Sequence, residues 1–557
     1  MKSKIIFLMV WLVGVLSGVA SGHTTPVHAA IFTADDTNNA TLARQHVFMV
    51  DKEGECLDPA ILWDWTDKHQ RQLRDHSLTL SNSLHQIEGG IQAWRTNRAA
   101  NPPPRVVVFV HGGMNPYSAS QDRLRDANFL NALAASNCYP IFVVWNSGPF
   151  SSYAQHLWSI RQGEKCDSLE RYYVGPLTSP LILISDLLRG LVRMPTTLVG
   201  RLNSDRITAE LPNGHAVKNW ENFDQLLTFN DTNSGLRNFP TFHPPQSEGN
   251  KRDWWERGIH LAEYIVTQPT KIVTLPILDG MGTEAWDIMQ RRTRTMFEAT
   301  DSHEIGRLIK DLNNYQKAPT NKPLVVHRWL DPIANDELLA PTNAQRGAMY
   351  FLSQEFAEWS TNQWLMPDGK SNSVAFEFYG HSMGSIVLNQ MFRNDPRIQA
   401  NRIVYLAAAC SIEDFKTALF PYLTAHPQTK FYSLSLYRLR ERDEFPLKMP
   451  VPFARDLIVR GSLLNWIDDI LAKPNSITDR TMGTWENMVR ALPDIPNDLR
   501  PRTFFRECDL EPQAAWSGGE GTFDPQVHGD FTRTIFWSPN FLWPTENKTN
   551  QLVMRKQ

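Results

Sequence analysis

Residues 374–384 read Val-Ala-Phe-Glu-Phe-Tyr-Gly-His-Ser-Met-Gly, and the order of residue types in this segment is the clearest indication of the fold. Residues 374–379 form an apolar, aromatic run that is typical of a buried strand in a parallel sheet. Two glycines flank Ser382 directly after this run, and residues 386–392 begin a helical pattern. The sequence therefore predicts a strand, a sharp turn at Ser382 and then a helix.

A second block earlier in the chain has the same organisation. Residues 101–104, Asn-Pro-Pro-Pro, break the chain, and residues 105–110, Arg-Val-Val-Val-Phe-Val, form a β-branched run that predicts another buried strand. This run ends in His111-Gly112-Gly113, and a helical pattern over residues 121–136 and a strand pattern over residues 139–145 follow. Strand, turn, helix and strand in this order indicate an α/β fold with a doubly wound, mostly parallel sheet.

The order of these patterns predicts the domain organisation. Further strands are expected at residues 403–408, 431–437 and 503–505, whereas helical patterns at residues 253–266 and 283–297 lie between the two blocks. We divide the chain into a signal peptide or anchor (1–29), a first part of the α/β core (30–149), a mainly helical cap insertion (150–342) and a second part of the core (343–557).

The insertion contains one unusually apolar helical segment, residues 180–198. Four of its apolar side chains share a helix face: Leu181, Ile184, Leu188 and Leu191. We expect this face to pack on the core; a cap helix over an apolar site and a membrane-surface helix are the alternatives. We also expect the insertion to cover Ser382 and to line an acyl pocket with Leu181, Ile184, Leu188, Trp254, Trp255, Trp286 and Met289.

The N-terminus predicts export. Lys2 and Lys4 precede an apolar run at residues 5–20, and a cleavage site before Ala30 is expected. An uncleaved anchor is the alternative, because the run approaches membrane-spanning length. Either arrangement places the body of the protein in the periplasm or outside the cell.

Composition excludes several classes of function. The 557 residues carry a formal net charge of -3 without long runs of like charge, so nothing points to nucleic acid. The five cysteines form no Cys-x-x-Cys motif, and His-Glu-x-x-His does not occur, so we expect no metal and no cofactor. Cys138 and Cys410 adjoin strand-like runs and are expected to be buried thiols.

Residues 380–384, Gly-His-Ser-Met-Gly, match the Gly-x-Ser-x-Gly pattern of a nucleophilic serine. A serine in a strained turn between strand and helix is exposed to substrate, and the amide of Met383 at the helix N-terminus would stabilise an oxyanion. A second oxyanion amide is expected from Gly113 or Met114, because these residues follow an early buried strand. His111 is expected to orient that loop.

A general base and an acid complete the predicted site. His528 follows a glycine-rich loop after the last predicted strand and is preferred to His426 because of its place in the chain order. The acid is expected after the strand at residues 431–437, where Asp443 is preferred. The alternatives for the acid are Glu444, Glu441 and Asp456.

These motifs resemble those of the α/β-hydrolase superfamily, in particular bacterial esterase-like and lipase-like members of uncharacterised function. The resemblance covers about residues 105–147 and 374–540 and includes the order Ser382, Asp443, His528; it departs from the family in the large insertion. It implies an exported serine hydrolase that cleaves small or lipid-like carboxylic esters, with contact to a membrane surface as a further expectation. Acyl transfer or amide cleavage by the same residues, and a catalytically silent envelope-binding protein, are the alternatives.

Overall fold

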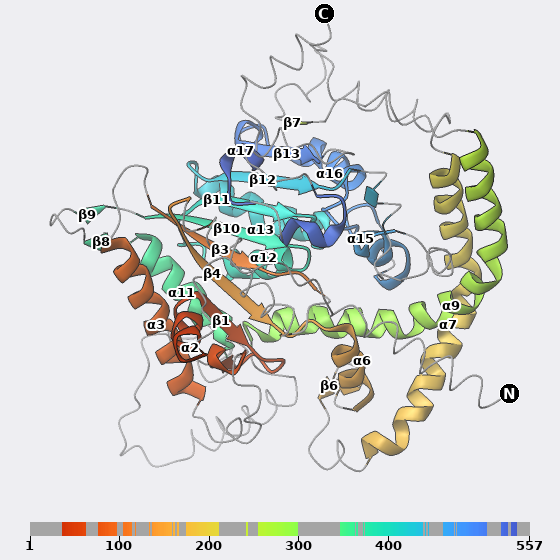
Figure 1. Cartoon of the computed structure of the whole chain (residues 1–557), viewed down its shortest axis with the longest axis horizontal. Coiled ribbons are helices and arrows are strands. Elements are labelled where there is room, and N and C mark those ends of the chain that lie inside the picture. Colours follow the sequence, from red (N-terminus) through yellow and green to blue (C-terminus); the bar gives the residue numbers. More distant parts are fainter. Residues whose placement is uncertain are drawn as a thin grey trace, which may run out of the picture.

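A nine-stranded sheet organises the described part of the chain (Figure 1). The computed structural model describes residues 36–62, 76–96, 104–113, 117, 133, 136–158, 160–161, 164–165, 174–210, 241–242, 254–298, 346–361, 364–365, 371–372, 374–437, 440–441, 444, 461–472, 474, 476–508, 525–532 and 536–542. The strand order is β2-β1-β4-β3-β10-β11-β12-β13-β7, and every neighbouring pair except β1 and β2 is parallel. The fold is therefore α/β with a mostly parallel sheet.

The strands of this sheet are short to medium in length. Their bounds are β1 Val47–Val50, β2 Cys56–Leu57, β3 Arg105–Val110, β4 Cys138–Trp145, β7 Thr241–Phe242, β10 Ala375–His381, β11 Ala400–Leu406, β12 Lys430–Ser435 and β13 Thr503–Glu507. Two small antiparallel pairs lie apart from it, β5 Ile160–Arg161 with β6 Glu164–Lys165 and β8 Trp364–Leu365 with β9 Ser371–Asn372.

Helices connect the strands and differ widely in length. The helices are α2 Asp36–His46, α3 His76–Thr96, α6 Pro149–Trp158, α7 Gly175–Glu210, α9 Trp254–Thr295, α11 Ala348–Thr361, α12 Gly384–Asn394, α13 Ile412–Ala425, α15 Leu463–Trp466, α16 Trp485–Ala491 and α17 Pro539–Leu542. Shorter helical turns are η2 Pro59–Leu62, η7 Ile467–Leu471, η8 Leu492–Asp494, η9 Arg500–Arg502 and η11 His528–Thr532.

The two faces of the sheet are covered by different parts of the chain. Phe378 of β10 meets Phe356 of α11 and Phe392 of α12, each at a ring-centroid distance of 5.4 Å. The next residue, Tyr379, meets Phe536 of the C-terminal segment at 5.1 Å. Because successive strand residues point to opposite faces, α11 and α12 cover one face and the C-terminal segment covers the other.

A buried ion-pair network lies on the face covered by the C-terminal segment. Glu377 of β10 is 1% exposed and binds Arg105 of β3 at 3.2 Å and Arg402 of β11 at 2.8 Å. Arg105 also donates a hydrogen bond to the carbonyl of Trp537. The network therefore connects three central strands with the C-terminal segment, and the paired charges offset the cost of burial.

The strands expected from the apolar runs are confirmed. Strands β3, β4, β10, β11, β12 and β13 form where these runs lie, and β4 is buried along its whole length. The sequence reasoning missed β1 and β2, which precede the Pro-rich break. It also missed β7, a two-residue strand inside the predicted insertion that pairs with β13 at the edge of the sheet.

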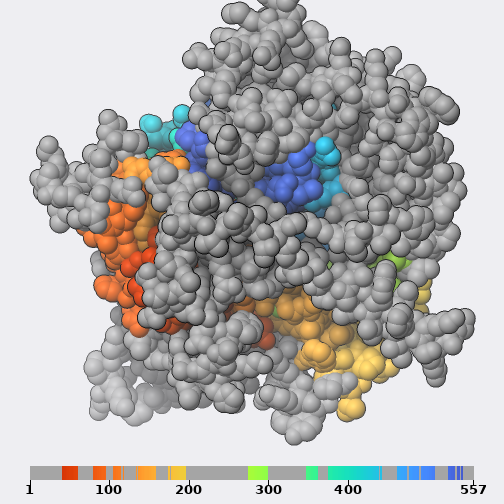
Figure 2. Space-filling view, viewed as in Figure 1, coloured from red at the N-terminus to blue at the C-terminus, as the bar shows by residue number. Residues whose placement is uncertain are grey.

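Helices dominate the described residues of the insertion. The helical patterns expected at residues 253–266 and 283–297 belong to one continuous helix, α9. Figure 1 shows α7 and α9 running side by side beyond the sheet. In the space-filling view, described N-terminal residues lie on the left and described C-terminal residues lie above the centre (Figure 2). Their backbones approach closely, because a Cβ on Gly190 of α7 would overlap the carbonyl of Pro276, and a Cβ on Gly280 of α9 would overlap that of Asp186.

The prediction that the apolar face of residues 180–198 packs on the core is wrong. Leu181, Ile184, Leu188 and Leu191 of α7 are between 50% and 67% exposed, so they do not line a pocket. Trp286 and Met289 of α9 are buried in the hydrophobic core instead. The acyl pocket expected from these side chains is therefore not formed by them; the side chains of Trp254 and Trp255 lie outside the described residues.

The structure also bears on the expectations for the cysteines, the N-terminal segment and one further helix. Cys138 and Cys410 are buried thiols, as expected. The predicted signal segment and nearly all of the helix expected at residues 121–136 lie outside the described residues. Among the described helices, none has the length and apolar character that a membrane-spanning helix requires.

Candidate active site

The candidate site lies where the order of the strands reverses. From β3 the chain continues to β4 on one side, whereas from β10 it continues through β11, β12 and β13 on the other. Since β3 and β10 are parallel neighbours, the loops that follow them emerge together at the carboxyl end of the sheet. In open α/β sheets this crevice is where ligands bind. The two loops are His111-Gly112-Gly113 and the turn at Ser382.

Ser382 occupies a strained turn between β10 and α12. Its φ of 52° lies in the left-handed region that residues with a side chain rarely adopt. The turn is held to the neighbouring strand, because the Ser382 amide donates to the carbonyl of Leu406 (2.9 Å) and its carbonyl accepts from the amide of Ala409 (3.0 Å). Surrounding hydrogen bonds therefore maintain the strain that a nucleophilic serine in a Gly-x-Ser-x-Gly turn requires.

Glycines allow the two loops and the helix to approach one another. A Cβ on Gly384 would overlap the carbonyl of Val110 at the end of β3. A Cβ on Gly380 would lie 2.8 Å from the amide nitrogen of Ser385. A Cβ on Gly112 would lie 2.6 Å from the Cβ of Ser382. The glycine-containing loop after β3 thus lies directly against the serine.

His111 orients this loop. Its Nδ1 lies 2.7 Å from the carbonyl oxygen of Gly112, and its Nε2 lies 3.1 Å from the backbone amide nitrogen of Trp145. The Gly112 carbonyl accepts a hydrogen bond, so Nδ1 must carry the proton and donate. The Trp145 amide donates, so Nε2 must be the acceptor, and these two contacts assign a neutral ring protonated on Nδ1. Ser147 also donates to the Gly112 carbonyl, at 3.1 Å. The position of His111 fits the expected orienting role.

The oxyanion amides are expected from Met383 and from either Gly113 or Met114. The structure describes Met383 and Gly113. Met383 is the N-cap residue of α12, so its amide belongs to the helix end whose N–H groups lack acceptors within the helix. Gly113 lies against Met383, since a Cβ on Gly113 would be 2.5 Å from Met383 Sδ. The Gly113 amide points away from the anchored Gly112 carbonyl because the peptide is trans and planar. Met114 lies outside the described residues.

His528 lies beside the residue that precedes Ser382. The ring centroids of His381 and His528 are 4.9 Å apart, and His381 Nε2 lies 3.0 Å from the carbonyl oxygen of His528. His381 therefore donates a hydrogen bond that holds the His528 backbone. The sequence reasoning assigned no role to His381, and only its place inside the serine motif could have suggested one.

The catalytic hydrogen bond expected between Ser382 and His528 is not formed. Within the described part of the chain, Ser382 Oγ and both ring nitrogens of His528 have no hydrogen-bond partner, although all three atoms are buried. Buried polar atoms are normally paired, and unpaired ones call for a functional explanation. Catalytic hydrogen bonds are often long in ligand-free structures.

Burial determines the charge of His528. Desolvation lowers the pKa of the His528 ring from its usual value to about 4. The ring is therefore neutral at neutral pH, which is the state in which an imidazole accepts a proton from a serine hydroxyl.

The candidate acids differ in their surroundings. Glu444 accepts a hydrogen bond from the backbone amide of His528 (2.9 Å) and so positions that residue without touching its ring nitrogens. Burial raises the pKa of Glu444 to about 8 and raises that of Glu441, which binds the Ser462 hydroxyl, well above its ordinary value. The Glu444 carboxyl is thus mainly protonated at neutral pH. Asp443 and Asp456 lie outside the described residues.

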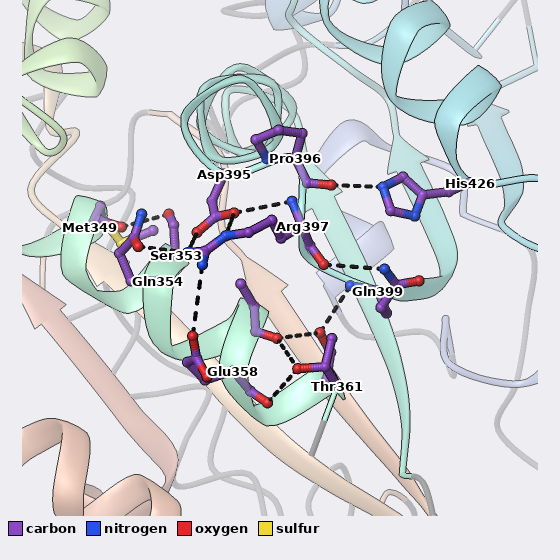
Figure 3. Close-up of polar contacts among 12 residues, drawn as sticks. Met349, Ser353, Gln354, Glu358, Thr361, Asp395, Pro396, Arg397, Gln399 and His426 are labelled. Atoms are coloured by element: carbon purple, nitrogen blue, oxygen red, sulfur yellow. Dashed lines mark hydrogen bonds and ion pairs between the residues drawn. The ribbon is translucent and has the colours of Figure 1, made fainter. Parts of the chain in front are cut away.

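His426 lies at the opposite end of the parallel strands from Ser382. It ends α13 and precedes β12, so it belongs to the amino end of the parallel strands, whereas Ser382 follows the carboxyl end of β10. Figure 3 shows its ring directed at the carbonyl of Pro396, 2.7 Å from Nε2. Its ring also stacks on Tyr422 at 4.4 Å. The structure therefore brings His528, and not His426, to the serine turn.

A second polar cluster lies among the helices of the insertion. Ligand atoms of His156, Asp186 and Glu284 lie within 4.8 Å of one another, a spacing that a metal ion could use. Arg189 Nη2, however, lies 3.3 Å from Asp186 Oδ1 and 2.5 Å from Glu284 Oε1. The guanidinium compensates both carboxylates, so the cluster acts as an ion-pair network that joins α6, α7 and α9.

No family model, no curated protein and no solved structure matches this chain.

Proposed function

We propose that the chain is a serine hydrolase of the α/β-hydrolase type that cleaves carboxylic esters. One observation carries the proposal: Ser382 adopts a φ of 52° in the turn after β10, at the point where the strand order reverses. Strain of this kind is retained at functional sites when the surrounding structure maintains it. The proximity of Gly112 on one side and of His528 beside His381 on the other supports the assignment.

In the proposed reaction, Ser382 Oγ attacks the ester carbonyl carbon while His528 accepts the hydroxyl proton. The oxyanion of the tetrahedral intermediate is stabilised by the amide of Met383 and by that of Gly113 or Met114. Collapse of the intermediate breaks the ester bond, and His528 returns the proton to the leaving alkoxide. Water then repeats these steps on the acyl-enzyme and releases the carboxylic acid. Asp443 remains our proposed partner of the His528 ring.

We further propose that the inserted helices act as a cap. The insertion begins after β4 and ends before β10, and a connection that follows a parallel strand emerges at the carboxyl edge, where Ser382 lies. Helix α9 contacts α12, whose N-terminus adjoins Ser382. A cap over the serine would exclude water and select the acyl group.

Ester hydrolysis by the purified chain tests the proposal. We expect turnover of p-nitrophenyl esters. Ser382→Ala should lower kcat by roughly a thousandfold or more. Ser476→Ala, at an exposed serine, is the control and should leave kcat unchanged.

The other outcomes identify the alternatives. Faster cleavage of p-nitroanilides would indicate an amidase, and ester formation with added alcohols in preference to hydrolysis would indicate an acyltransferase. No turnover of any of these substrates by the unmodified chain would favour a silent binding protein.

A further inference from the structure

Arg292, in the last turn of helix α9, carries a buried charge. The residue is 2% exposed, and burial lowers the pKa of its guanidinium to about 10, so it is charged at neutral pH. No carboxylate among the described residues forms an ion pair with it, and Glu53 raises its pKa through charge alone. Buried charges are normally paired with opposite ones, so this guanidinium calls for an explanation.

The hydrogen bonds of Arg292 all end on neutral oxygens. Its Nη1 donates to the main-chain carbonyl of Asn146 (2.8 Å) and to the hydroxyl of Ser151 (3.1 Å). Its Nη2 donates to the main-chain carbonyl of Ser151 (3.1 Å), and its Nε donates to Gln155 Oε1 (2.9 Å). Asn146 directly follows β4, and the other two residues belong to α6. Arg292 therefore fastens the inserted helix α9 to the loop at the carboxyl end of β4.

The loop after β4 in turn holds the loop after β3. The hydroxyl of Ser147 donates a hydrogen bond to the carbonyl of Gly112 (3.1 Å). Arg292 binds the carbonyl of Asn146, which belongs to the peptide that joins Asn146 to Ser147. Because a peptide is planar, a fixed carbonyl also fixes the direction in which Ser147 leaves it. Two consecutive contacts thus connect the guanidinium to the Gly112 carbonyl.

We propose that Arg292 is a positioning residue for the oxyanion loop, His111-Gly112-Gly113. It acts through Asn146 and Ser147, which hold the Gly112 carbonyl so that the Gly113 amide is directed at the oxyanion. The planar guanidinium suits this role, because its donors have fixed directions and meet several acceptors at once. A carboxylate partner would draw these donors away from the loop. The inference rests on the proposed serine-hydrolase function, since the oxyanion forms only in that reaction.

Steady-state ester hydrolysis by the full chain tests this inference. Arg292→Gln should lower kcat roughly tenfold to a hundredfold and keep KM within about twofold, because a misplaced oxyanion donor affects the transition state. Arg292→Lys keeps a charged donor and should recover part of the loss. Ser147→Ala should lower kcat in the same way. The double variant should lose no more than the larger single loss, because both residues act in one series of contacts.

Arg502→Gln is the matched control. Arg502 also donates to main-chain carbonyls, but to those at the end of α13 and before β12, namely Leu423 (2.6 Å), His426 (2.9 Å) and Thr429 (3.3 Å). These carbonyls lie at the amino end of the parallel strands, away from Ser382. Arg502→Gln should lower the urea midpoint and leave kcat unchanged. A loss of kcat in Arg292→Gln no larger than in Arg502→Gln would overturn the inference, and so would additive losses in the double variant.

Hydrogen exchange separates this inference from the proposed function, because it requires no turnover. The Trp145 amide donates to His111 Nε2 (3.1 Å), so a peptide of residues 141–148 reports on the contact between the two loops. Arg292→Gln should speed exchange of this peptide roughly tenfold or more and leave a peptide of residues 430–435 in β12 unchanged.

The exchange result decides the role of Arg292 whatever the kinetics. If the unmodified chain cleaves no ester, the proposed function fails, while faster exchange confined to residues 141–148 still supports positioning of the loop by Arg292. Unchanged exchange of that peptide would overturn the inference even in an active enzyme. Should Arg292→Gln not fold, Arg292→Lys and Ser147→Ala provide the same comparisons.

Discussion

The imidazole of His381 donates a hydrogen bond from Nε2 to the main-chain carbonyl oxygen of His528, and the two atoms are 3.0 Å apart. This contact joins His381, the residue before Ser382 in the serine motif, to a C-terminal segment 147 positions later in the chain. The His528 amide also donates a hydrogen bond to Glu444, so the backbone of the proposed base is held at both its carbonyl and its amide.

His381 should therefore act as a positioning residue. His381→Phe removes the donor while keeping a ring, and we expect kcat to fall by roughly tenfold to a hundredfold with little change in KM. His381→Gln retains a donor and should recover part of the loss. Steady-state kinetics of both variants provide the measurement, and equal loss in both would show that the hydrogen bond has no such role.

The two candidate bases should differ sharply. His528→Ala should reduce kcat/KM nearly as much as Ser382→Ala, because residues of a catalytic unit act together. The kcat/KM of His426→Ala should remain within a few-fold of that of the unmodified protein, since the His426 ring binds the Pro396 carbonyl at the opposite end of the strands. The reverse ranking of the two variants would move the base away from His528.

The pH dependence of kcat/KM should reflect the burial of His528. Because desolvation lowers the pKa of this ring to about 4, the base is neutral above that pH and protonated below it. Activity should stay on a plateau down to about pH 5 and fall as the pH decreases through about 4. Return of samples to neutral pH controls for unfolding. A midpoint near the ordinary imidazole value of about 6.5 would contradict this assignment.

Gly112 should be sensitive to the smallest side chain. Its added Cβ would lie 2.6 Å from the Cβ of Ser382, so Gly112→Ala should displace the serine turn and reduce kcat severalfold or more. Gly89→Ala in α3 is the control, because a Cβ there meets no atom within 4 Å. It should keep full activity and raise stability by about 0.5–1 kcal/mol. Urea unfolding and kinetics of both variants provide the test, and unchanged kcat for Gly112→Ala would speak against the close contact.

The central strands could be predicted from sequence because their apolar runs are buried on both sides. Residues 105–110 and 139–145 read as strands and form β3 and most of β4. Strand β2 and strand β7 have two residues each, which is too short to give a pattern. Their places in the sheet depend on tertiary pairing alone.

The part of the site that lies within one turn could be predicted from the sequence. The part that depends on contacts between distant segments could not. The Ser382 turn follows from local sequence, because strand, glycines and helix are contiguous. The contact between His381 and His528 depends on how the C-terminal segment covers the sheet face, which leaves no local pattern. The orientation of α7 likewise could not be read from its periodicity, since an apolar stripe has the same spacing whether it faces the core or the surface.

Labelling with a fluorophosphonate probe tests the central claim most directly. The probe reacts covalently with an activated serine, so peptide mapping should find a single adduct, on Ser382. Ser382→Ala should abolish the adduct, and Ser476→Ala should retain it. Full labelling of Ser382→Ala, or no labelling of the unmodified chain, would contradict the assignment of Ser382 as the nucleophile.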